Sequence, residues 1–237
     1  MKKGIDVSRH NGSVDWLNVK DSSQVDFAIL RAGYGKLLSQ KDSCFEEYYA
    51  QCRKYGIPTG AYWYSYAKSV SEIQTEAEVF LQAIAGKQFA YPVYLDFEEN
   101  SQFALGKAKC SEMAKAFLEI VEKAGYFAGL YSSKSHLETY FTEELRNRYA
   151  VWVAHYGVAK TDYAGQFGMW QKSEKGSVSG ISGYVDLNEC YVDYPEIIQN
   201  AGLNGFQKAE TAPAEPEIIR ITLEYQGEKY SGTLTKI

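Results

Sequence analysis

The chain has 237 residues, of which 45% are hydrophobic and 23% are charged. This composition is typical of a soluble globular protein with one large domain and room for a small appendage. A formal net charge of −5 offers no basic cluster for phosphates, so we expect no nucleic acid partner. No stretch reaches membrane-spanning length, and the initial Met-Lys-Lys leads into Gly4 rather than into an apolar signal segment, so neither a membrane span nor a signal peptide is expected.

Three classes of chemistry are poorly served by the residues of this chain. The four cysteines show no Cys-x-x-Cys spacing and the three histidines show no His-x-x-x-His spacing, so neither a zinc site nor a redox motif is expected. No Gly-x-Ser-x-Gly elbow indicates a serine hydrolase. We therefore expect neither a metal nor a cofactor.

The first two-thirds of the chain alternate between apolar strands and amphipathic helices. Strands are expected at Gly4–Ser8 and Phe27–Ala32. Three helices then follow, each ending at a glycine and each followed by another apolar strand, which is the pattern of parallel βα units. These three strands are expected at residues 59–66, 91–97 and 126–131.

The last third contains strands without room for long helices between them. Residues 150–156, 167–171 and 184–187 are strand-like, and segments rich in Gly and Ser join them. About eight strands in all predict an α/β fold, a modified TIM-like (β/α) barrel with reduced helices in its last third. A doubly wound open sheet is the alternative, disfavoured because no Gly-x-Gly-x-x-Gly or phosphate loop follows a strand.

The composition changes sharply after the barrel, which is expected to occupy residues 1–203. Residues 204–217 hold two of the five prolines and almost no large apolar side chain, as expected of a linker. Residues 218–237 alternate apolar and polar side chains around a turn at residues 226–229, which predicts a C-terminal β-hairpin. A lone hairpin is marginally stable in water, so we expect it to bind the surface on which the protein acts or to mediate self-association.

Two carboxyl groups end the fourth predicted strand. Asp96 and Glu98 follow Val93-Tyr94-Leu95, and side chains two residues apart on a strand share a face, with Cα atoms roughly 6.6 Å apart. Burying two carboxylates is costly without a function. A proton donor beside an anion is the arrangement that cleaves glycosidic bonds.

Two more acids are expected at the same end of the barrel. Asp6 ends the first predicted strand and Asp186 the last, and these strands are neighbours in a closed barrel. Catalytic groups of such barrels lie at the carboxyl ends of the strands. Crowded, partly buried carboxyl groups raise one another's pKa, which would keep one of them protonated near neutral pH.

In order, the motifs of the chain resemble those of glycoside hydrolase family 25, the lysozymes of the Chalaropsis and phage-endolysin type. The matching stretches are Gly4–Ser8, Asp15-Trp16, Ile29–Tyr34, Gly60–Ser65, Tyr94–Glu98, Gly129–Tyr131, Val151–Ala154, Met169–Gln171 and Val185-Asp186. The resemblance implies a modified β/α barrel that hydrolyses the β-1,4 bond between N-acetylmuramic acid and N-acetylglucosamine in bacterial peptidoglycan.

By position, the resemblance implies that Glu98 is the general acid and Asp96 its partner, with Asp6 and Asp186 as the remaining acids. The positions that match a sugar-binding groove are Tyr62, Tyr64, Tyr131, Trp152 and Gln171, with Arg31 and Tyr34 as weaker candidates. We expect substrate-assisted retention, because inversion through water needs carboxyl groups roughly 6.5 to 9.5 Å apart. The chain departs from the family pattern at Arg9-His10-Asn11 and at His155.

Two other functions stay open at this point. A catalytically silent glycan-binding barrel would keep the aromatic groove, and a related glycosidase would act on a chitin-like substrate, since a fold alone does not set specificity. The expected place of action is the bacterial cell wall. The protein would be made in the host cytoplasm if it is a phage lysin, or be extracellular if it is exported by other means.

Overall fold

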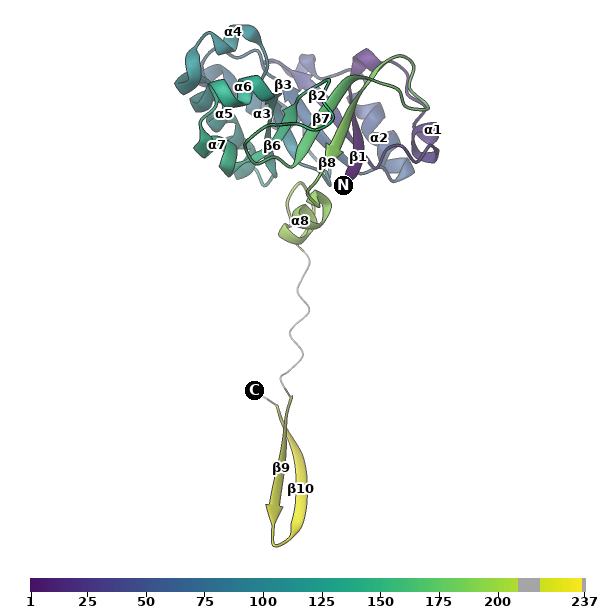
Figure 1. Ribbon diagram of the computed structural model, residues 1–237, viewed down its shortest axis with the longest axis vertical. Coiled ribbons are helices and arrows are strands. Elements are labelled where there is room, and N and C mark those ends of the chain that lie inside the picture. The colour runs from purple at the N-terminus through teal and green to yellow at the C-terminus, as the bar shows by residue number, and fades with distance from the viewer. Residues whose placement is uncertain (209–217, 236–237) are drawn as a thin grey trace.

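A computed structural model describes residues 1–208 and 218–235 of the chain. Eight strands form a closed barrel in sequence order (Figure 1). They are β1 (Lys2–Val7), β2 (Phe27–Tyr34), β3 (Thr59–Tyr64), β4 (Val93–Asp96), β5 (Ala128–Ser133), β6 (Ala150–Ala154), β7 (Met169–Gly176) and β8 (Val185–Cys190). The predicted eight-stranded barrel is confirmed, and the open sheet is excluded because β8 pairs with β1.

The helices surround the first six strands. They are α1 (Trp16–Asp21), α2 (Phe45–Tyr55), α3 (Val70–Ile84), α4 (Asn100–Phe103), α5 (Gly106–Lys123), α6 (Lys134–Tyr140), α7 (Glu143–Arg148) and α8 (Tyr194–Ala201). Residues 155–168 and 177–184, which join the last three strands, contain no helix. The predicted loss of helices in the last third is therefore confirmed. Strands β1 to β7 are parallel to their neighbours, whereas β8 runs antiparallel to both β7 and β1.

Two apolar cores stabilise the barrel. The outer core lies between the strands and the helices, where the Phe80 ring packs against Trp63 and Phe117 with ring centroids 5.7 and 5.8 Å away. The inner core fills the barrel with aromatic rings, among them Tyr94. A side chain at Gly129 would lie 2.4 Å from the Tyr94 ring, so glycine is required there for the ring to cross the interior.

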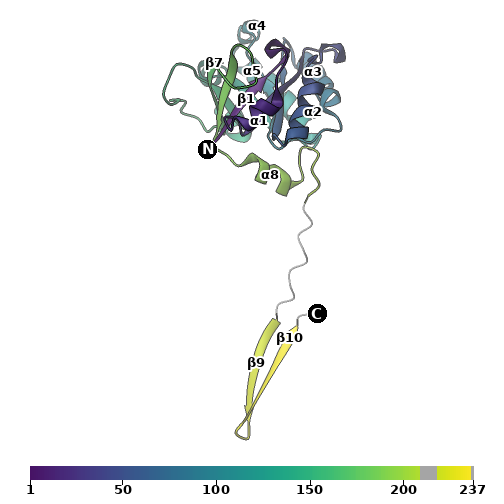
Figure 2. The ribbon, with the colours of Figure 1, turned by 90° about the vertical axis from the view of Figure 1, so that its right-hand side faces the viewer.

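Helix α8 closes the end of the barrel that is opposite the carboxyl ends of β1 to β6. Figure 2 shows α8 below the barrel, near the N-terminus. The strand before it ends at Cys190, whose register partner is Lys2 at the start of β1. Tyr194 of α8 packs against Tyr91 and Phe127, with ring centroids 6.3 and 5.7 Å apart. Among the described residues, the end of the barrel that α8 leaves open is the one at the carboxyl ends of β1 to β6.

The chain keeps its contacts with the barrel slightly beyond residue 203. Asn204 is fully buried, and its Nδ2 group donates hydrogen bonds to the carbonyl oxygens of Phe89 at 3.0 Å and Tyr91 at 2.8 Å. Phe206 packs against the inner core. We therefore propose that the linker begins after Phe206 rather than at Asn204.

The C-terminal hairpin consists of β9 (Ile218–Tyr225) and β10 (Glu228–Thr235), paired antiparallel. Its turn residues Gln226 and Gly227 both have positive φ, of 52° and 84°, as in the tight turns that join hairpin strands. The predicted hairpin is confirmed, with a two-residue turn. Among the described residues, no helix has the length and apolar character to cross a membrane.

Candidate active site

A pocket of about 240 Å³ opens at the carboxyl ends of the parallel strands. It is lined by Asp6, Tyr62, Asp96, Glu98, Tyr131, Trp152, Tyr156, Gln171, Glu174 and Asp186. All four predicted acids and four of the seven predicted sugar-binding residues therefore surround one space. A second cavity, of about 490 Å³, shares Glu98, Tyr131 and Tyr156 with this pocket and extends it over the start of α6 as a groove.

A larger cavity of about 580 Å³ lies between α5 and α7, away from the strand ends. It also contains carboxylates, but they are solvated, and Glu122 is paired with Arg148 at 2.6 Å. Exposed and ion-paired carboxylates of this kind are ordinary surface charges. The smaller pocket is therefore the better candidate for catalysis.

The backbone around Phe97 turns Asp96 and Glu98 to the same side. Strand β4 ends at Asp96, yet the Phe97 N–H still donates to the carbonyl of Tyr131 at 3.1 Å, and Ser132 Oγ donates to the Phe97 carbonyl at 2.6 Å. The Phe97 ring is buried in the outer core. The side-chain alternation expected from the sequence thus continues beyond the end of β4 as far as Glu98.

Asp6 and Asp186 face each other across the seam that closes the barrel, because they are register partners on β1 and β8. The prediction that Asp186 ends the last strand is wrong, since it is the second residue of β8, which begins at Val185. Strand β8 is antiparallel to β1, so its amino end, rather than its carboxyl end, lies at the mouth of the pocket.

Asp6 is held by a chain of hydrogen bonds that fixes which of its atoms accept. The Trp152 indole N–H donates to Asn188 Oδ1 at 2.8 Å, which leaves Asn188 Nδ2 to donate to Asp6 Oδ2, also at 2.8 Å. The Tyr131 hydroxyl donates to Gln171 Oε1 at 2.7 Å, and Gln171 Nε2 donates to the same Asp6 Oδ2 at 2.8 Å. Two N–H donors on one oxygen lower the pKa of Asp6, against the larger effect of burial.

Burial is the largest cause that raises the pKa of each of the four acids. The pKa of Glu98 rises to about 7 through burial and the charge of Asp186, and that of Asp186 to about 6 through burial and the charge of Glu174. The pKa values of Asp6 and Asp96 lie well above their usual range, because burial is reinforced by Asp186 and by Glu98, respectively. In a cluster coupled in this way, at least one acid retains its proton near neutral pH.

Three residues of the site were not predicted from the sequence. Tyr156 lines the pocket, and its hydroxyl donates to Gln171 Oε1. Glu174 adds a fifth carboxyl group from the outer part of β7, and Asn188 is 1% exposed beneath Asp6. Asn188 lies within β8, two residues before the strand ends at Cys190, so a search for polar residues at strand ends does not find it.

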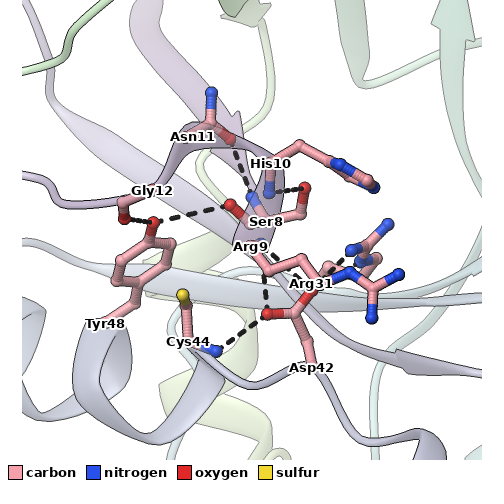
Figure 3. A network of polar contacts seen from close by, with 9 residues as sticks. All are labelled: Ser8, Arg9, His10, Asn11, Gly12, Arg31, Asp42, Cys44 and Tyr48. Carbon is pink, nitrogen blue, oxygen red and sulfur yellow. Dashed lines mark hydrogen bonds and ion pairs between the residues drawn. The ribbon is translucent and has the colours of Figure 1, made fainter.

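The other three predicted sugar-binding residues do not line the pocket. Arg31 forms an ion pair with Asp42, with both Nε and Nη2 2.7 Å from Oδ2 (Figure 3). The Tyr34 ring lies 5.5 Å from the Arg9 guanidinium carbon. The Tyr64 hydroxyl donates to Glu99 Oε2 at 3.4 Å, at the edge of the acid cluster.

Comparison with known proteins places the chain in a family. Residues 5–181 match the family model described as "Glycosyl hydrolases family 25". The uncharacterised protein YegX of Escherichia coli K12 is 34% identical over 198 residues, which are 78% of this chain and 68% of YegX. The autolytic lysozyme of Clostridium acetobutylicum is 29% identical over 79% of this chain and 55% of its own length. The crystal structure of the CTP1L endolysin superposes with a TM-score of 0.74 at 31% identity, over 84% of this chain and 70% of CTP1L. The chain therefore belongs to glycosyl hydrolase family 25.

Proposed function

We propose that this chain is a peptidoglycan hydrolase, a lysozyme that cleaves the β-1,4 bond between N-acetylmuramic acid and N-acetylglucosamine. The observation that carries this function is the meeting of Asp6, Asp96, Glu98 and Asp186 in one pocket of a family 25 barrel. The groove that extends the pocket suits a polymeric substrate. Aromatic rings in the walls of both cavities provide flat faces and hydroxyl groups for sugars.

Glu98 acts as the general acid in this proposal. Its pKa of about 7 keeps a large fraction of the side chain protonated at neutral pH, and unlike Asp6 and Asp96 it is only partly buried. A carboxylic acid in that state protonates the leaving glycosidic oxygen as the anomeric carbon develops positive charge. The negative charge of Asp186 helps to hold this proton on Glu98.

Asp96 acts as the stabilising partner. Its Oδ1 atom is buried and accepts no hydrogen bond from any described residue, so it is available to a substrate N–H or to developing positive charge. We propose substrate-assisted retention, in which the acetamido group of the sugar attacks the anomeric carbon while Asp96 orients it. The alternative is that Asp96 directs a water molecule, which would invert the configuration.

The decisive test is mass spectrometry of borohydride-reduced products from purified peptidoglycan. We expect the new reducing ends to be muramic acid, as cleavage of the proposed bond requires. Reduced glucosamine ends, or cleavage of chitin oligomers at a comparable rate, would assign the pocket to the related glycosidase instead. Binding to the wall without any new reducing ends would indicate the catalytically silent barrel.

The C-terminal hairpin is proposed to add wall affinity or self-association to the barrel. Two strands alone are marginally stable in water, and the Tyr225 and Tyr230 side chains are 66% and 56% exposed. Deletion of residues 207–237 is expected to weaken binding to wall sacculi in a pelleting assay, or to lower the mass measured by light scattering, with little change in the turnover of soluble fragments. If wall binding and mass both stay unchanged, the hairpin has neither role.

A further inference from the structure

A buried ion pair adjoins the acid pocket without belonging to it. The side chain of Asp42, which lies between β2 and α2, is 1% exposed, and that of Arg31 on β2 is 11% exposed. Two nitrogens of Arg31 contact Asp42 Oδ2, each at 2.7 Å. Such a pair is expensive to break, because removal of one partner leaves the other charge buried and uncompensated.

The same carboxylate also holds the backbone of the loop that follows β1. The Arg9 N–H lies 3.1 Å from both Asp42 oxygens, and the Cys44 N–H donates to Oδ1 at 3.0 Å (Figure 3). Arg9 begins a short 3-10 helix, Arg9–Asn11, whose capping residue Ser8 accepts a hydrogen bond from His10. The segment fixed in this way starts at Arg9, three residues after Asp6.

Arg31 stands beside the pocket. Its register partner on β3 is Tyr62, which lines the pocket, and the positive charge of Arg31 acts on Asp96, whose pKa it lowers against the effects of burial, Glu98 and Asp6. Arg31 is a full positive charge next to several carboxyl groups, yet it is paired outside their cluster. Asp42 supplies the competing negative charge.

We propose that Asp42 is a positioning residue of the acid pocket: its carboxylate keeps the Arg31 guanidinium outside the cluster of acids and fixes the loop after β1. This inference rests on the proposed function of the pocket for its catalytic consequence, but not for its effect on charge. Without Asp42, Arg31 finds its nearest opposite charges among the pocket acids. An ion pair with Asp96 would lower the pKa of that side chain and leave it more ionised in the pocket.

The charged groups that face these residues come from several elements. Asp42 faces Arg31 from β2, together with Arg9 and His10 from the loop after β1. Asp96 faces Glu98 on its own segment, Asp6 from β1 and Arg31 from β2. Glu98 in turn faces Asp186 from β8 and its neighbour Glu99. Of these, only Arg31 and Asp42 change partners in the variants described next.

The test compares Asp42→Asn, Arg31→Met, Arg31→Lys and the double variant in the full-length protein. The readout is the titration of Asp96, followed by NMR of ¹³Cγ-labelled aspartate and assigned with Asp96→Asn. Arg31→Met removes a positive charge and should raise the Asp96 pKa by about 1 unit, whereas Asp42→Asn frees that charge and should lower it by about 1 unit. Arg31→Lys keeps the charge and should titrate as the wild type does.

The double variant should titrate as Arg31→Met does, because the charge of Asp42 affects the titration of Asp96 only through Arg31. The optimum pH for hydrolysis of soluble peptidoglycan fragments should fall in Asp42→Asn and recover in the double variant. Shifts in the same direction for Asp42→Asn and Arg31→Met, or no shift in either, would overturn the proposal and leave the ion pair with a structural role alone. If Asp42→Asn does not fold, Asp42→Ser, which removes the same carboxylate, is compared with Arg31→Met in its place. Because the titration needs no activity, a wild type that fails to cleave peptidoglycan would sink the proposed function while leaving this test intact.

Discussion

Replacement of Glu98 by Gln is expected to lower the rate of peptidoglycan hydrolysis by about 10²- to 10⁴-fold, the range that general acid catalysis contributes. The amide has nearly the same shape as the acid but has no proton to give to the leaving oxygen. Wild-type activity should also fall as the pH rises through about 7, because the pKa of Glu98 lies there. The measurement is the initial rate of release of reducing ends between pH 4 and pH 9.

The matched control is Glu99→Gln, the same chemical change one residue further along the chain. Glu99 does not line the pocket, and its carboxylate accepts a hydrogen bond from Tyr64. Its variant should retain activity within a few fold of the wild type, with a slightly lower basic limit because Glu99 helps to raise the pKa of Glu98. Undiminished lysis by Glu98→Gln, with full loss in Glu99→Gln, would reverse the two assignments.

The central pair of the site could be predicted because its geometry is local. Strand alternation alone requires that Asp96 and Glu98 share a face, and Phe97 between them is apolar enough to be buried on the opposite face. Likewise, Gly56 ends α2 and precedes β3, and it marks a boundary that depends on short-range backbone conformation. Features of this kind are encoded within a few residues.

The direction of the last strand could not be predicted, because no local pattern distinguishes a parallel from an antiparallel strand of six residues. Asp186 still reaches the pocket, since its register with Asp6 places it at the mouth whichever way β8 runs. The extension of β7 to Gly176, which brings Glu174 to the pocket, also follows from its antiparallel pairing with β8. Tertiary pairing therefore supplied what the sequence pattern could not.

Arg31 illustrates a second limit of prediction from the sequence. Its place in a family motif suggested a sugar contact, but its charge is engaged by Asp42, eleven residues further along the chain. A sequence shows that an arginine is available, whereas its partner depends on how β2 and the turn before α2 are packed. A site residue predicted from a motif alone is thus predicted less reliably than one supported by both strand geometry and the cost of burying a charge.

Replacement of Asp96 by Asn is expected to stabilise the fold at neutral pH while it removes activity. Burial raises the pKa of Asp96 well above the value of 3.8 for a free side chain, so ionisation is disfavoured more in the folded than in the unfolded state. The folded state of the wild type thus binds the proton of Asp96 more tightly than the unfolded state does. The stability that this binding contributes is complete below pH 3.8 and is lost as the pH rises through the raised pKa. Each unit of that rise costs about 1.4 kcal/mol at high pH.

An amide at position 96 has no charge to desolvate and does not carry this cost. The difference in melting temperature between Asp96→Asn and the wild type should therefore be small at pH 3.5 and should grow towards pH 8, by about 2 to 4 °C per kcal/mol in a protein of this size. Asp162→Asn is the control, because Lys134 lowers the pKa of Asp162 and its amide variant should gain no stability at pH 8. A melting difference that does not change with pH would mean that the Asp96 carboxyl keeps its proton throughout, and it then could not serve as the anion that stabilises positive charge on the substrate.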